Sequence, residues 1–247
     1  MLDVDPDHGG QDSLDRLVYL ILAELEERHQ GKRTLQDSTA QDGWPDRGVY
    51  FFFEPGELRS DQKTPRVVRV GTHALRPRSG TSIWGRLAQH RGTTGGSLPG
   101  GGNHRGSIFR LHVGTALIQR DGLTNEATRT WGIGGSAPRA TRSVEFGLEK
   151  AVSDHIRQLP LLWVDVPDPS GPDSARGMIE SNMIALLSNL GREAINPASP
   201  AWLGRFADRQ AVRDSHLWNV NHVDGAYDAS FLDVLEHRVA QTSSARR

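Results

Sequence analysis

The 247-residue sequence contains no cysteine, which excludes disulfide bonds and metal sites built from thiolates. It has no apolar run near the roughly 20 residues that a membrane-spanning helix needs. Its first residues, Met1-Leu2-Asp3-Val4-Asp5, are acidic, whereas a secretory signal begins with positive charge. These absences favour a cytoplasmic protein that does not act on membranes.

Lysine is scarce as well, since the chain has 3 lysines and 26 arginines. The formal net charge is −1, yet residues 58–143 hold fourteen basic residues against three acids, Asp61, Asp121 and Glu126. A local excess of this kind is typical of a surface that meets nucleic-acid phosphates. High-GC codon usage is the alternative explanation for the basic residues. It explains why arginine outnumbers lysine, but it does not explain why residues 58–143 contain so few acids.

Two short strands and a helix are predicted between residues 47 and 90. Arg47–Phe53 and Pro65–Gly71 are β-branched or aromatic runs bounded by turn residues. Thr81 or Ser82 is a suitable N-cap for a helix over residues 83–90. Arg86 and His90 are four residues apart, so they share one face of that helix.

This order resembles the GIY-YIG nuclease family, in which two strand motifs precede a helix with Arg and His four residues apart. Gly48-Val49-Tyr50 matches the first motif with Val for Ile, and Arg69-Val70-Gly71 matches the second with Arg for the usual Tyr. The resemblance covers residues 47 to about 92 and about 159 to 197. The stretch between them is interpreted as an insertion.

The resemblance implies a catalytic role for each matching residue. Tyr50 would act as the general base or orient the attacking water, His90 would accept or relay the proton, and Arg86 would hold the phosphate. Glu180, on an amphipathic helix predicted over residues 175–189, would bind Mg²⁺ or Mn²⁺. Asn196 is the candidate for the family's Asn, with Asn189 as the competing assignment.

Further residues are candidates for substrate binding. Arg69 replaces a phenol, and it either lowers the pKa of the neighbouring Tyr50 by its charge or marks an altered or inactive site. Thr72 directly follows the second motif. His104 and Arg105 are interpreted either as phosphate ligands or as part of a hydrogen-bonded loop.

The expected fold class is α/β, with a small, mostly antiparallel three-stranded sheet flanked by helices. Residues 1–46 are expected to form an N-terminal helix and a linker, and residues 47–197 a GIY-YIG-like nuclease domain with an insertion at about 92–158. Residues 198–247 would be a C-terminal helical extension whose tail, from Ala240, is disordered.

The sequence therefore predicts a divalent-metal-dependent DNA endonuclease. RNA stays open as a substrate, and the sequence indicates no oligomeric state. Two alternatives are a nucleic-acid-binding module of the same fold with impaired catalysis, and a protein-interaction domain in which the motifs are coincidental.

Overall fold

A four-stranded sheet lies at the centre of the structure, a computed structural model that describes residues 6–242. The strands are β1 (Arg33–Thr34), β2 (Gly48–Leu58), β3 (Pro65–Gly71) and β4 (Pro160–Asp165), in the order β1-β4-β2-β3 with antiparallel pairing throughout. The sequence predicted β2, β3 and β4. The two-residue β1 is a fourth strand, and it lies in the segment expected to be a linker.

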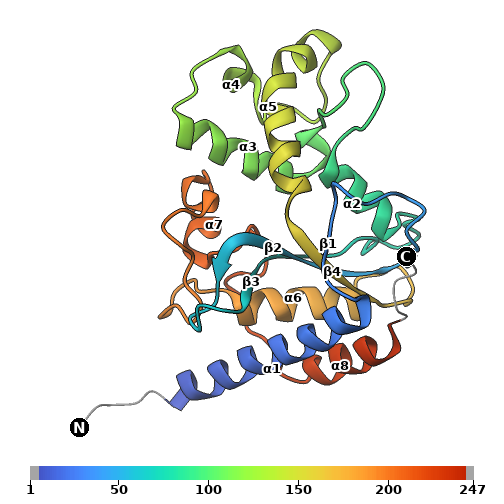
Figure 1. The fold of residues 1–247 in the computed structure, drawn as a ribbon, viewed down its shortest axis with the longest axis vertical. Coiled ribbons are helices and arrows are strands. Elements are labelled where there is room, and N and C mark those ends of the chain that lie inside the picture. Colours follow the sequence, from blue (N-terminus) through green and yellow to red (C-terminus); the bar gives the residue numbers. More distant parts are fainter. Residues whose placement is uncertain (1–5, 243–247) are drawn as a thin grey trace.

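Helices cover both faces of the sheet, because the central strand β2 is apolar on both sides (Figure 1). Val49, Phe51 and Phe53 face α1 (Pro6–His29), α6 (Ala175–Leu187) and α8 (Phe231–Gln241). Tyr50 and Phe52 face the opposite layer of α2 (Ile83–Arg91), α3 (Ile108–Asp121) and α5 (Arg139–Arg157). The expected α/β architecture with an antiparallel sheet between helices is thus confirmed.

The segment at about 92–158 is mostly helical and packs over the sheet as one group of elements (Figure 1). It contains the short helix η1 (His104–Gly106), then α3, α4 (Glu126–Thr130) and α5. α3 and α5 pack against each other, and Phe109 and Val152 join the same core as Tyr50. These residues therefore form part of the layer that covers one sheet face.

The C-terminal region also contributes to the fold beyond a simple extension. It contains η2 (Leu203–Phe206), α7 (Gln210–Ser215) and α8. Between α7 and α8, the Trp218 backbone N–H donates to the Val68 carbonyl at 2.7 Å, so this segment lies along the outer edge of β3. The predicted disordered tail is wrong for Ala240 and Gln241, which belong to α8, and residues 243–247 lie outside the described residues.

Across residues 6–242, the structure has no helix with the length and apolar character required to cross a membrane.

Candidate active site

The two motif glycines allow close contacts that position the motif tyrosine. β2 and β3 pair with Tyr50 opposite Gly71, and a Cβ on Gly71 would lie 2.4 Å from the tyrosine ring. A Cβ on Gly48 would lie 2.3 Å from the Val164 carbonyl oxygen of β4. Any larger residue at either position would displace β2 or the Tyr50 ring.

Tyr50 and His90 are hydrogen-bonded, as their shared candidate role requires. The Tyr50 hydroxyl lies 2.8 Å from His90 Nε2, and His90 Nδ1 lies 2.8 Å from the Ser107 hydroxyl. Burial, followed by the charges of nearby arginines, lowers the pKa of His90 well below its usual value, so the ring is neutral near pH 7. A neutral imidazole has one donor nitrogen and one acceptor nitrogen.

Ser107 favours one of the two tautomers of His90. Its hydroxyl oxygen caps α3 by accepting from the Arg110 backbone N–H at 3.3 Å, and Ser107 is almost completely buried. The hydroxyl also has one proton to donate, and among the described residues His90 Nδ1 is the acceptor that lies against it. The Ser107 hydroxyl therefore makes this hydrogen bond only if it donates to His90 Nδ1. His90 then carries its proton on Nε2 and donates it to the Tyr50 oxygen, so the role of direct proton acceptor that the resemblance implies for His90 does not fit this tautomer.

Arg69 is buried beside the same tyrosine. Its position opposite Phe52 places it on the sheet face of Tyr50, and its guanidinium carbon lies 4.7 Å from the centre of the Phe109 ring. Arg69 Nη1 donates to the Trp218 carbonyl at 2.8 Å. Burial lowers the pKa of Arg69, while the neighbouring Tyr50 and Glu180 raise it.

Glu180 reaches the end of β3 from α6, on the other side of the sheet. Its Oε1 accepts from the Thr72 backbone N–H at 3.1 Å, while the Thr72 hydroxyl donates to the Gly48 carbonyl at 2.8 Å. Burial raises the pKa of Glu180, and the charges of Arg69 and Arg86 oppose this increase. Thr72, a predicted substrate ligand, therefore orients the carboxylate through its backbone.

These side chains meet at one cleft of about 550 Å³ at the end of β3. Of the predicted site residues, the structure brings five to its walls: Tyr50, Arg69, Thr72, Arg86 and Glu180. His90 is fully buried behind Tyr50 and acts on the cleft through that residue. The cleft thus receives a phenol from β2, one guanidinium group each from β3 and α2, and a carboxylate from α6.

A second hollow of about 650 Å³ continues from this cleft, and Thr72, Leu75 and Arg86 line both. Its other walls include Arg76 and Arg78, which are exposed in the loop between β3 and α2. Arg86 Nη1 donates to the Gln89 side chain and to the Gly106 carbonyl. We call Arg76, Arg78 and Arg86 the arginine ridge, and it offers positive charge beside the cleft.

Many of the other basic residues in 58–143 form ion pairs with acids from outside that segment. Examples are Arg59 with Asp15 and Arg66 with Glu57. Acids from other elements thus offset part of the positive charge of the segment. The basic surface is therefore smaller than the sequence count suggests.

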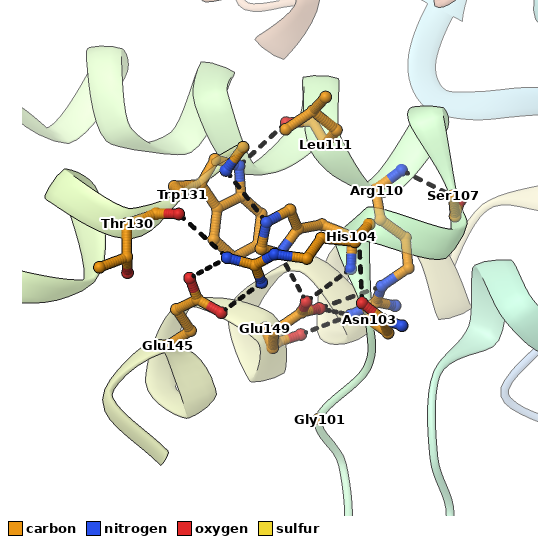
Figure 2. A network of polar contacts seen from close by, with 12 residues as sticks. Gly101, Asn103, His104, Ser107, Arg110, Leu111, Thr130, Trp131, Glu145 and Glu149 are labelled. Carbon is orange, nitrogen blue, oxygen red and sulfur yellow. Dashed lines mark hydrogen bonds and ion pairs between the residues drawn. The ribbon is translucent and has the colours of Figure 1, made fainter. Parts of the chain in front are cut away.

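His104 belongs to a buried polar network (Figure 2), and Arg105 joins it through Glu145. His104 Nδ1 lies 2.9 Å from Glu149 Oε1, and the ring stacks on Trp131 with centroids 3.8 Å apart. Arg105 donates to both carboxylate oxygens of Glu145, at 2.7 and 2.8 Å. Of the two interpretations made from sequence, the structure favours the hydrogen-bonded loop over the phosphate ligands.

The same network supports the end of α2. Arg110 pairs with Glu149 and donates from Nη1 to the His90 carbonyl at 2.8 Å. The network therefore ties α3 and α5 to the backbone of the residue that contacts Tyr50. Its effect on the cleft is positional.

Asn196 does not reach the cleft. Its amide nitrogen donates to both oxygens of Asp15, at 3.1 and 3.0 Å, and its oxygen accepts from the Ser60 N–H. Asn189 instead holds a turn by accepting from the Ile195 N–H at 3.1 Å. The structure thus places both candidates for the family's asparagine in structural contacts away from the proposed chemistry.

Sequence reasoning missed several residues that line the cleft. His112 comes from α3, and four more come from the C-terminal region: Arg209, Asn219, Asn221 and His222. The side chain of Asn219 bonds both the N–H and the carbonyl of Val70, which fixes this region along β3. The two histidines at positions 216 and 222 are the sequence signal that marks this region.

Glu180 is the only acidic side chain among the residues that line the cleft. Residues 6–242 contain no group of three or more His, Asp or Glu side chains that could hold a metal together. Mg²⁺ commonly keeps several waters and binds one or two carboxylates together with substrate phosphates. A single carboxylate in a cleft that two arginines also line fits an ion held jointly with a phosphate-bearing substrate.

A family model described as a GIY-YIG domain matches residues 9–245, a range that includes every element of the cleft and the helical segment at 92–158. No curated protein and no solved structure matches the chain.

Proposed function

The chain belongs to the GIY-YIG domain family, as its two strand motifs and its Arg-His helix predicted, and on this premise we propose that it is a divalent-metal-dependent DNA endonuclease. One observation carries the proposal: Tyr50, Arg69, Arg86 and Glu180 line the same cleft. Each supplies a group that phosphodiester hydrolysis needs, namely a proton acceptor, cations for the phosphate and a carboxylate for a metal.

Tyr50 is proposed to take the proton of the attacking water. As the water oxygen forms its bond to phosphorus, its O–H bond breaks and the proton passes to the phenolate oxygen. His90 Nε2 lies 2.8 Å from that oxygen and would donate to it, and Arg69 lies on the same sheet face. Arg69 stands where the second motif of the family usually has Tyr. In this interpretation, the positive charge of Arg69 takes over the electrostatic contribution of that tyrosine.

Arg86 and the rest of the arginine ridge are proposed to bind the DNA backbone. A guanidinium group presents several donors in one plane and can contact two phosphate oxygens at once. Arg86 reaches both hollows, so it can meet the phosphate being cut while Arg76 and Arg78 meet its neighbours. RNA presents the same phosphate chemistry, and comparison with a matched RNA tests the choice of DNA.

Glu180 would hold the divalent ion, with the Thr72 N–H fixing the direction of its carboxylate. The chemistry supplied by such an ion would be electrostatic stabilisation of the negative charge that develops on the phosphate and the leaving group. The charges of Arg69 and Arg86 favour the ionised form of Glu180, against the larger effect of burial on its pKa.

Plasmid nicking by the purified full chain tests the proposal. Supercoiled plasmid should be nicked with Mg²⁺ or Mn²⁺ and should stay intact with EDTA. Tyr50→Phe keeps the buried ring but removes the hydroxyl, so the rate should fall by about 10²–10⁴, the usual contribution of a general base. Tyr227→Phe, a matched change outside the cleft, should leave the rate unchanged.

Each alternative to the proposal has its own result. A protein that retards DNA with and without metal, but never cuts it, is a binding module in which Arg69 accompanies loss of catalysis. A protein that neither binds nor cuts nucleic acid contradicts both nucleic-acid functions and favours an interaction domain.

A further inference from the structure

His112 lines the cleft and has no hydrogen-bond partner there. It lies on α3, is 1% exposed, and neither ring nitrogen is hydrogen-bonded among the described residues. Its Nδ1 lies 3.6 Å from Asp208 Oδ1, which is beyond hydrogen-bond range. By contrast, both ring nitrogens of His90 are bonded.

A buried polar group without a partner is costly, and such groups are uncommon in folded proteins. A ligand that enters the cleft and supplies the partner would remove this cost on binding. The cleft is large enough for more than one phosphate group, since its volume of about 550 Å³ is within the range of pockets that hold whole small molecules.

The charges around His112 indicate an anionic ligand. Burial has the largest effect on the pKa of His112 and lowers it. Asp208 raises the pKa, while Arg69 on β3 and Arg209 after η2 lower it further. The resulting pKa is about 4, so the ring is neutral near pH 7. A phosphate that contacts both the imidazole and Arg209 would add negative charge beside Asp208, whose carboxylate lies 3.6 Å from His112 Nδ1 and 3.9 Å from Arg209 Nε. It would also favour protonation of His112.

We propose that His112 and Arg209 form a second phosphate subsite, which binds a phosphodiester next to the one that is cut. This inference rests on the proposed function, because the scissile phosphate is the one assigned to Tyr50, Arg86 and Glu180. Occupation of the subsite couples DNA binding to uptake of a proton by His112. The helical segment at 92–158 thereby adds a substrate contact to the cleft formed by the strand motifs.

Binding measured in a Glu180→Gln background tests this subsite without cleavage and without the titration of Glu180. The probe is a short fluorescein-labelled DNA duplex, followed by fluorescence anisotropy. Affinity should rise as the pH falls from about 8 to about 5.5, because the bound state holds one more proton on His112.

Adding His112→Gln should abolish most of this pH dependence and weaken binding about tenfold at the lower pH. The slope of log K against log salt should also become shallower by about 0.9, the value for one lost phosphate contact on duplex DNA. His112→Phe fills the same space without polar nitrogens, so it should fold at least as stably and bind as weakly as His112→Gln.

His155→Gln is the matched control. The pKa of His155 is also lowered to about 4 by burial, and its Nε2 also has no hydrogen bond, but it does not line the cleft. This variant should keep the affinity, pH dependence and salt dependence of the Glu180→Gln protein.

Unchanged affinity, pH dependence and salt slope in His112→Gln would overturn the subsite while leaving the proposed function intact. Failure of the Glu180→Gln protein to bind any duplex would instead count against the proposed function. In that case ¹⁵N NMR of the His112 ring during addition of the dinucleotide dTpdT decides about the subsite: a shift toward imidazolium supports it, and no shift refutes it.

Discussion

Glu180→Gln replaces one carboxylate oxygen by an amide group and removes the only negative charge among the residues lining the cleft. The remaining oxygen of Gln can still accept the Thr72 N–H, which lies 3.1 Å from Glu180 Oε1. Since that hydrogen bond is kept, the free energy of unfolding should change by less than about 1 kcal/mol.

The pH dependence of the free energy of unfolding indicates whether Glu180→Gln raises or lowers stability. Burial raises the pKa of Glu180, so the folded state holds this proton more tightly than the unfolded state. The stability that the protonated group contributes is present at low pH and is lost as the pH rises through the raised pKa. Glu180→Gln should therefore be at least as stable as the wild type above that pH, measured by urea unfolding.

Activity should respond very differently. A metal ion contributes several kcal/mol to the transition state, and every 1.36 kcal/mol is a tenfold change in rate, so nicking should fall by at least about 10³-fold. DNA affinity should be equal or higher, because a negative charge is removed beside Arg69 and Arg86. Single-turnover plasmid nicking and fluorescence anisotropy measure the two effects separately.

Asp165→Asn is the matched control, since burial also raises the pKa of Asp165 but its side chain does not line the cleft. It should nick plasmid at the wild-type rate. Undiminished nicking by Glu180→Gln would refute the metal assignment and the reasoning built on it.

Three further changes test the surroundings of Tyr50 and the core. Arg69→Tyr restores the residue usual in the family but removes a buried cation beside Tyr50, so nicking should drop by about 10²-fold, and an undiminished rate would show that the charge is dispensable. Ser107→Ala removes the cap of α3 and the partner of His90 Nδ1; it should cost about 1 kcal/mol in urea unfolding and shift the ¹⁵N signals of the His90 ring, whereas Ser107→Thr should do neither. Burial raises the pKa of Glu54 from 4.5 to about 7, so the stability from its protonated form is present below about pH 4.5 and lost as the pH rises through 7. Glu54→Gln should therefore gain more stability relative to wild type at about pH 8 than at about pH 5, by up to about 3 kcal/mol, and an equal gain at both pH values would contradict this account.

Local patterns in the sequence determined where most elements near the site lie. The helix with Arg86 and His90 was predicted over residues 83–90 and is observed at Ile83–Arg91, capped by Ser82. The predicted strand Pro65–Gly71 has the observed bounds of β3. These predictions succeed because strand alternation, helical period and capping depend on residues only a few positions apart.

The tertiary structure alone decided which side chains meet. Arg105 pairs with Glu145 and Asn196 with Asp15, so neither reaches the cleft. From the segment interpreted as an insertion, His112 lines the cleft and Ser107 contacts His90 behind Tyr50. The partners in these contacts lie between 17 and 181 positions apart in the chain. The spacing of residues within one helix or strand does not predict these contacts. A long side chain pairs with whatever charge the packing of distant elements brings within a few ångströms.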